Sequence, residues 1–89
     1  MKEYVKNKIY KLLKDIDSSN FDWSVQENET LAELFGGIPG RKNDLVVNLK
    51  IVELVVGTEQ IFGVEIKKDF RNIAFMKPKD FVDYVFYMT

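Results

Sequence analysis

Residues 44–56 read DLVVNLKIVELVV, and this stretch decides the fold class. Its valines, leucines and isoleucine are typical of β-strands, because such side chains pack well on a pleated, half-buried surface. The alternation changes phase along the stretch: every second residue over 45–51 is apolar on one face, and then every second residue over 52–56 on the other. A strand that buries a single face cannot do this, so we expect a bulge or break near Ile51.

The flanking segments extend this stretch into a small sheet. Residues 57–60, GTEQ, predict a turn, and residues 61–68, IFGVEIKK, return as a second strand with alternating inward side chains. Residues 70–76, FRNIAFM, indicate a third strand, and residues 21–25, FDWSV, a short fourth. We expect an antiparallel meander of three to four strands.

Helices complete an α+β domain that spans residues 1–89 as one unit. Residues 2–17 carry apolar side chains at helical spacing and predict an N-terminal helix. Thr30 and Glu33 match a capping box that starts a short middle helix. Pro78 suits the first turn of a C-terminal helix, although the aromatic and β-branched residues after it also suit a strand.

Composition excludes several classes of function. The chain has 13 basic and 14 acidic residues and a net charge of −1, which does not favour nucleic-acid binding. It has no cysteine and no histidine, which excludes Cys/His zinc sites and Ser-His or Cys-His catalysis. The N-terminal segment has no continuous apolar run, so we expect neither a signal peptide nor a membrane span, and a cytoplasmic protein.

Two segments suggest contacts with a protein partner. Residues 36–43, GGIPGRKN, form a glycine-rich loop that carries Arg41 and Lys42. Residues 80–89, DFVDYVFYMT, are unusually apolar for a chain end, and such a segment favours a homodimer or partner interface. The candidate anchors of a partner are Arg41, Lys42, Tyr84, Phe86 and Tyr87.

An acid-x-lysine pattern, Glu65-Ile66-Lys67, places a carboxylate and an ammonium on the same side of a strand. With Glu3 on the first helix and the turn GIPGRKND ending in Asp44, the order of motifs resembles the PD-(D/E)xK nuclease superfamily, especially its compact VRR-NUC domains. The resemblance covers about residues 1 to 68. It implies that Asp44 and Glu65 bind Mg²⁺ or Mn²⁺ and that Lys67 assists the attacking water. Asparagine, not proline, precedes Asp44 here.

The hairpin register offers a different pair of carboxylates. Pairing the apolar residues of 52–56 with those of 62–66 sets Glu53 opposite Glu65. Asp44 then lies roughly 30 Å along its strand at about 3.3 Å per residue, too far to share a metal. Glu53, Glu65 and Lys67 therefore form the alternative catalytic set, with the two glutamates as metal ligands. The other interpretation of the same residues is a solvated strand face.

Taken together, these features favour a small non-enzymatic protein-binding module that needs no cofactor. In composition the chain resembles the short, cysteine-free α/β proteins rich in lysine, asparagine and glutamate that recur among phage anti-defence inhibitors and immunity proteins, and this resemblance implies action by blocking a protein partner. A small metal-dependent nuclease is the alternative. A third possibility is a nucleic-acid binder that uses the lysine-rich first helix.

Overall fold

The computed structural model describes residues 2–16, 29–36 and 45–89, and these residues form helices and their connections with no strand. The predicted α+β class and its antiparallel meander are therefore wrong. The helices are α1 (Lys2–Ile16), α3 (Leu31–Leu34), α4 (Leu45–Phe62), α5 (Phe70–Ala74) and α6 (Pro78–Met88).

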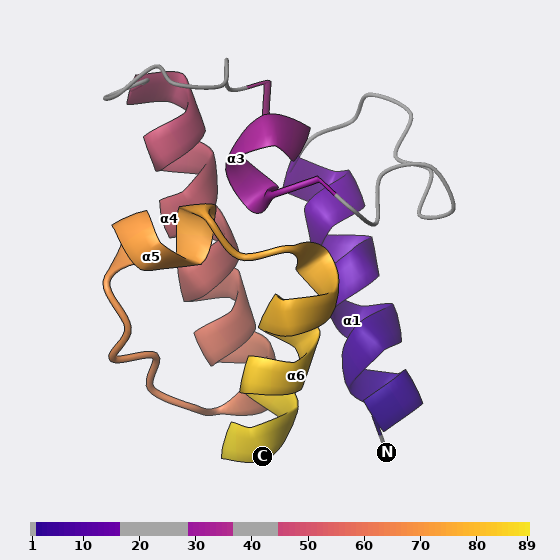
Figure 1. Ribbon diagram of the computed structural model, residues 1–89. Coiled ribbons are helices and arrows are strands. Elements are labelled where there is room, and N and C mark those ends of the chain that lie inside the picture. Colours follow the sequence, from indigo (N-terminus) through magenta and orange to yellow (C-terminus); the bar gives the residue numbers. More distant parts are fainter. Residues whose placement is uncertain (1, 17–28, 37–44) are drawn as a thin grey trace.

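Three longer helices set the shape of the domain (Figure 1). Helix α1 packs against both α4 and α6, and it runs antiparallel to each, so α1 begins and α6 ends at the same end of the molecule. The two short helices lie towards the opposite end, where α5 packs on α4 and α3 contacts both α4 and α5. The long α4 is therefore the element that most of the others pack against.

Helix α4 replaces the first predicted strand and part of the second. Its buried side chains are Val47, Ile51, Leu54 and Thr58, which recur at the spacing of one helix face. The expected break at Ile51 is wrong, because this residue is fully buried at the centre of that face. The change of phase in the sequence came from the helical period of these buried residues. Apolar residues on the other sides of the helix made that period difficult to recognise.

The turn predicted at 57–60 lies inside α4, which continues to Phe62. Gly63 ends the helix: its φ of 65° is left-handed, and its N–H donates to the carbonyl of Glu59 at 2.9 Å. Residues 64–68 then run without helix or strand pairing, so the predicted second strand is wrong.

The predicted third strand is helix α5. Asp69 caps it, since its carboxylate accepts a hydrogen bond from the N–H of Arg71 at 2.8 Å. Only Ile73 and Ala74 of this helix are buried. A helix of one turn is too short to show its period in the sequence, so the bulky apolar residues suggested a strand.

Three predictions about helices are confirmed. Helix α1 has nearly the predicted bounds. The capping box forms at α3, where the Thr30 hydroxyl accepts from the N–H of Glu33 at 3.2 Å and the Glu33 carboxylate accepts from the N–H of Thr30 at 3.2 Å. Pro78 stands in the first turn of α6, which settles the chain end as helix. The strand predicted at 21–25 lies outside the described residues.

Each of the five helices in the described residues contributes to one hydrophobic core. Its fully buried large side chains include Ile9, Leu13, Leu31, Ile51, Leu54, Ile73, Phe81 and Val85. None of the helices in the described ranges is both long and apolar enough to cross a membrane.

Candidate functional site

The most unusual surface in the described part of the chain is the outward face of α4. Leu45, Leu49, Val52 and Val56 leave 71, 57, 42 and 44% of their surfaces exposed. They are spaced by four, three and four residues, so they lie one above another along a single line on the helix. We call this line the α4 outer stripe.

The outer stripe lies opposite the core. At about 100° per residue, its mean direction is about 160° from that of Val47, Ile51, Leu54 and Thr58, the buried residues of the same helix. Helix α4 is therefore apolar on two opposite sides and covered by the described helices on one. A helix that is apolar all round is usually buried all round.

The charged side chains in this part of α4 lie beside the stripe and not on it. Within the stretch from Leu45 to Val56 the ionisable side chains are Lys50 and Glu53, and both lie to the same side of the stripe. Glu53 is exposed, whereas Lys50 is half-buried. The stripe itself thus has the composition of an interface centre, in which charged residues are depleted.

The proposed carboxylate pair does not form by the expected route. Glu53 lies in the middle of α4, and Glu65 lies on the segment after Gly63, so the hairpin pairing that set them opposite each other is absent. Asp44 lies outside the described residues. No group of three or more acidic side chains within the described ranges could hold a metal ion.

Glu65 and Lys67 are more exposed than their apolar neighbours, as the alternation of polar and apolar residues in this segment predicts. Both are exposed, whereas Val64 and Ile66 between and beside them are half-buried. The N–H of Ile66 donates to the carboxylate of Glu59 at 2.8 Å, which ties this segment to α4. Glu65 and Lys67 are thus both accessible to solvent, on a segment that pairs with no strand in the described residues.

The predicted aromatic anchors on α6 differ in accessibility. Tyr87 is 85% exposed, whereas Tyr84 and Phe86 are half-buried. The Lys68 ammonium lies 5.5 Å from the centre of the Tyr84 ring, and the ring centres of Phe86 and Tyr87 are 6.1 Å apart. Helix α6 buries one side on the core, through Phe81, Val82 and Val85. The other anchors, Arg41 and Lys42, lie outside the described residues.

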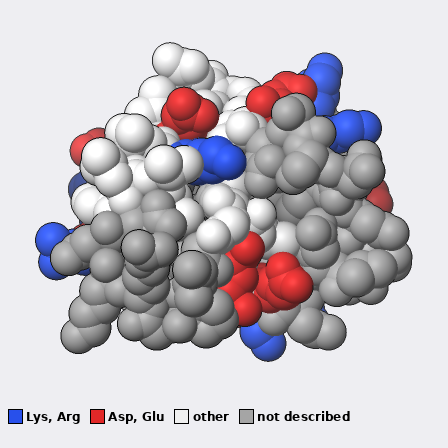
Figure 2. Space-filling view, turned by 90° about the horizontal axis from the view of Figure 1, so that it is seen from above, with Lys and Arg blue, Asp and Glu red and all other residues white. Residues whose placement is uncertain are grey.

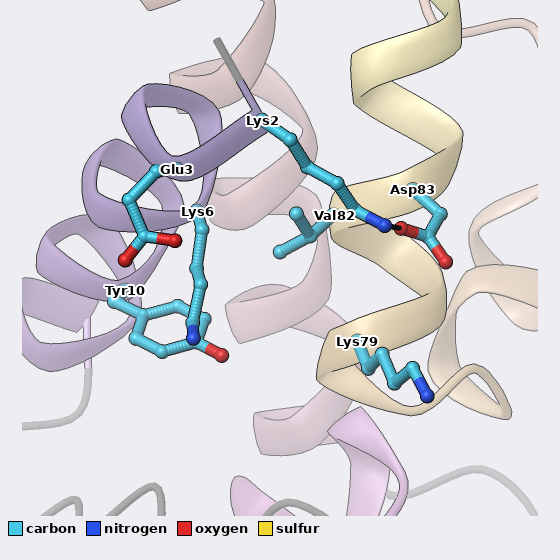
Figure 3. Close-up of a pocket in the computed structure, with 7 residues that line it drawn as sticks. All are labelled: Lys2, Glu3, Lys6, Tyr10, Lys79, Val82 and Asp83. Carbon is cyan, nitrogen blue, oxygen red and sulfur yellow. Dashed lines mark ion pairs between the residues drawn. The ribbon is translucent and has the colours of Figure 1, made fainter.

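A hollow of about 240 Å³ lies between α1 and α6, lined by residues of both helices (Figure 3). The Lys2 ammonium forms an ion pair with the Asp83 carboxylate across it. On the α1 side, the Lys6 ammonium lies 5.3 Å from the centre of the Tyr10 ring. Both lysines are thus engaged within the chain. Because Glu3 and Asp83 also line it, the hollow carries both signs of charge.

Charges of both signs are also mixed elsewhere. Figure 2 shows the molecule from above, with acidic and basic side chains scattered in small groups among uncharged ones on the described part of this face. Such mixing does not resemble the continuous basic surface that a duplex or single strand requires.

Sequence reasoning missed the α4 outer stripe because it assigned its residues to a strand. The signal was present, since Leu45, Leu49, Val52 and Val56 are spaced alternately by four and three residues, as the apolar positions of a heptad pattern are.

A scan against protein-family models finds no match for the chain, and neither do searches of the curated proteins and of the solved structures.

Proposed function

We propose that this chain is a non-enzymatic protein-binding module whose partner docks on the α4 outer stripe. The observation that carries the proposal is that α4 is apolar on two opposite sides while the described helices cover only one of them. Contiguous exposed apolar surface on a small domain commonly marks a protein interface, because water there is released on binding.

The remaining features support binding in preference to catalysis. Within the described ranges no three acidic side chains come together as a metal site would require, and two of the three lysines at the α1–α6 hollow, Lys2 and Lys6, are engaged with Asp83 and Tyr10. A small domain of this kind would act by covering a surface of its target, as inhibitors and immunity proteins do. The absence of cysteine fits a reducing compartment such as the cytoplasm.

The proposal is tested by comparing what three versions of the chain retain from an extract of its native cell. The interface variant is Leu49→Gln/Val52→Gln, in which glutamine keeps the helix propensity and removes the apolar surface. The matched control is Phe75→Gln, which removes another large apolar side chain, 77% exposed, just after α5. Circular dichroism verifies that all three retain their helices.

A protein that wild type and Phe75→Gln retain, and that Leu49→Gln/Val52→Gln loses, supports the assignment. If all three versions retain the same set of proteins, the outer stripe is not the binding surface.

A further inference from the structure

We infer that the occupant of the α4 outer stripe is a second copy of this chain, with the two α4 helices packed antiparallel about a two-fold axis. This inference rests on the proposed function, because it names the partner of the same surface. It is carried by the spacing of the stripe residues, which is the same in both directions along the helix.

The spacing is symmetric about one point on α4. Leu45 and Val56 are equally far from the midpoint between residues 50 and 51, and so are Leu49 and Val52. A two-fold axis beside this midpoint sets Leu45 against Val56 of the second copy, and Leu49 against its Val52. Every leucine then meets a valine, so a large side chain faces a smaller one across the seam at each level, an arrangement that favours close packing of two helices.

This symmetry is what a self-complementary interface needs. In a two-fold dimer the same patch occurs on both sides, so a residue that contacts another is contacted by it in return. The alternation of four, three and four residues is also the spacing with which antiparallel helices interdigitate. An unrelated partner would place no such condition on the order of leucine and valine.

Charge does not oppose the pairing. The net charge of −1 per chain gives little long-range repulsion between copies. Along the stripe of α4 no ionisable side chain enters the seam, since Glu53 lies to one side of it.

The size of the stripe sets the strength of the association. Its four residues extend about 16 Å along the helix at 1.5 Å per residue. One helical seam of this length is smaller than the roughly 800 Å² per partner of a standard stable interface. We therefore expect a reversible dimer that dissociates on dilution, and not a permanent one.

The register is tested by introducing opposite charges at Leu45 and Val56. Within one helix these residues are about 16 Å apart and do not interact, whereas the two-fold pairing places them in contact between copies. The variants are Leu45→Glu, Val56→Lys and Leu45→Glu/Val56→Lys. Both positions are exposed, and a carboxylate at Leu45 stands in the first turn of α4, where the helix dipole favours it, so the fold is retained.

Sedimentation equilibrium of the full chain, from micromolar to millimolar concentration, measures the dimer. We expect each single variant to weaken dimerisation by about tenfold or more, which corresponds to about 1.4 kcal/mol. The double variant should recover most of that loss, because the carboxylate introduced in one copy then meets the ammonium introduced in the other. Phe75→Gln should dimerise as wild type does.

Two results would overturn the inference. One is a wild-type chain that is monomeric over the whole range. The other is a double variant that dimerises no better than the weaker single variant. If the chain is monomeric but still retains another protein through Leu49 and Val52, the second copy is excluded and the binding function stands. If it is monomeric and retention does not depend on these residues, both proposals fail.

Discussion

Gly57 of α4 faces Leu12 of α1 so closely that a β-carbon at the glycine would lie 2.9 Å from both terminal methyl groups of the leucine. A residue typical of turns thus stands inside a helix at a position where a larger side chain would push the leucine aside. Glycine weakens a helix by about 1 kcal/mol relative to alanine, but here it lets α1 approach α4. The cost in helix propensity is offset by the packing of the two helices.

Replacing Gly57 therefore has an effect that depends on Leu12. In the wild-type background Gly57→Ala gains helix propensity but crowds the leucine, so we expect a loss of stability or no gain. In a Leu12→Ala background the same change should stabilise the fold by up to about 1 kcal/mol, because the crowding is gone. A double-mutant cycle by urea denaturation measures the coupling, expected at about 0.5 kcal/mol or more. Equal effects of Gly57→Ala in both backgrounds would show that the contact does not restrict α4.

Thr58 and Thr30 should respond in opposite directions to removal of the hydroxyl. Thr58 is fully buried, and its hydroxyl has no hydrogen-bond partner in the structure. Thr58→Val should stabilise the fold by about 1 kcal/mol, because a buried unpaired hydroxyl costs free energy. Thr30→Val removes the cap of α3 and should cost about 1 kcal/mol. Thermal denaturation compares the two, and destabilisation by Thr58→Val would mean that its hydroxyl is satisfied.

The hydrogen bond from the Ile66 N–H to the Glu59 carboxylate should hold the segment after α4 in place. We expect Glu59→Ala to lower the free energy of unfolding by about 1.5 kcal/mol, a typical contribution of a hydrogen bond to a charged group. Glu59→Gln should lower it less, because an acceptor remains. Glu65→Ala serves as the control, since Glu65 is exposed, and should change stability by less than about 0.5 kcal/mol. Amide hydrogen exchange at Ile66 reports the local effect, and unchanged protection in Glu59→Ala would contradict it.

The ion pair between Lys2 and Asp83 predicts a dependence of stability on alkaline pH. The hydrogen bond to the Asp83 carboxylate holds the pKa of Lys2 above its ordinary value near 10.5. The pair therefore contributes to stability below that ordinary value, and the contribution is lost as the pH rises through the raised pKa. Because Lys2 is at the surface, the effect should be small and should weaken with added salt.

Thermal midpoints measured from neutral to alkaline pH test this, with Lys2→Met beside wild type. The difference between the two proteins should shrink as the pH passes the lysine range. Lys79→Met is the control, since Lys79 lines the same hollow. If the difference in thermal midpoint between wild type and Lys2→Met stays constant over the whole pH range, the ion pair is not the cause of that difference.

The sequence predicted the parts of the fold that local chemistry determines. The charged and apolar residues of α1 separate cleanly into two faces, and the Thr30–Glu33 capping box and Pro78 are chemical marks of helix starts. Around Val47 and Ile51 that separation is missing, because α4 is apolar towards the core and towards the outer stripe alike. Intrinsic preference then suggested a strand, and tertiary packing overrode it.

The candidate site was hidden for the same reason. The outer stripe can be recognised only after Leu45–Phe62 is known to be a helix, since its residues share a face at helical spacing alone.

An interface between copies of the chain at the outer stripe would place its four side chains in a different environment in the dimer and in the monomer. Methyl NMR spectra of the leucines and valines, recorded over a dilution series, test it most directly. We predict that the signals of Leu45, Leu49, Val52 and Val56 shift together on dilution while those of the buried Leu13 and Val85 stay in place. Stripe signals that do not move between micromolar and millimolar concentration would contradict the claim.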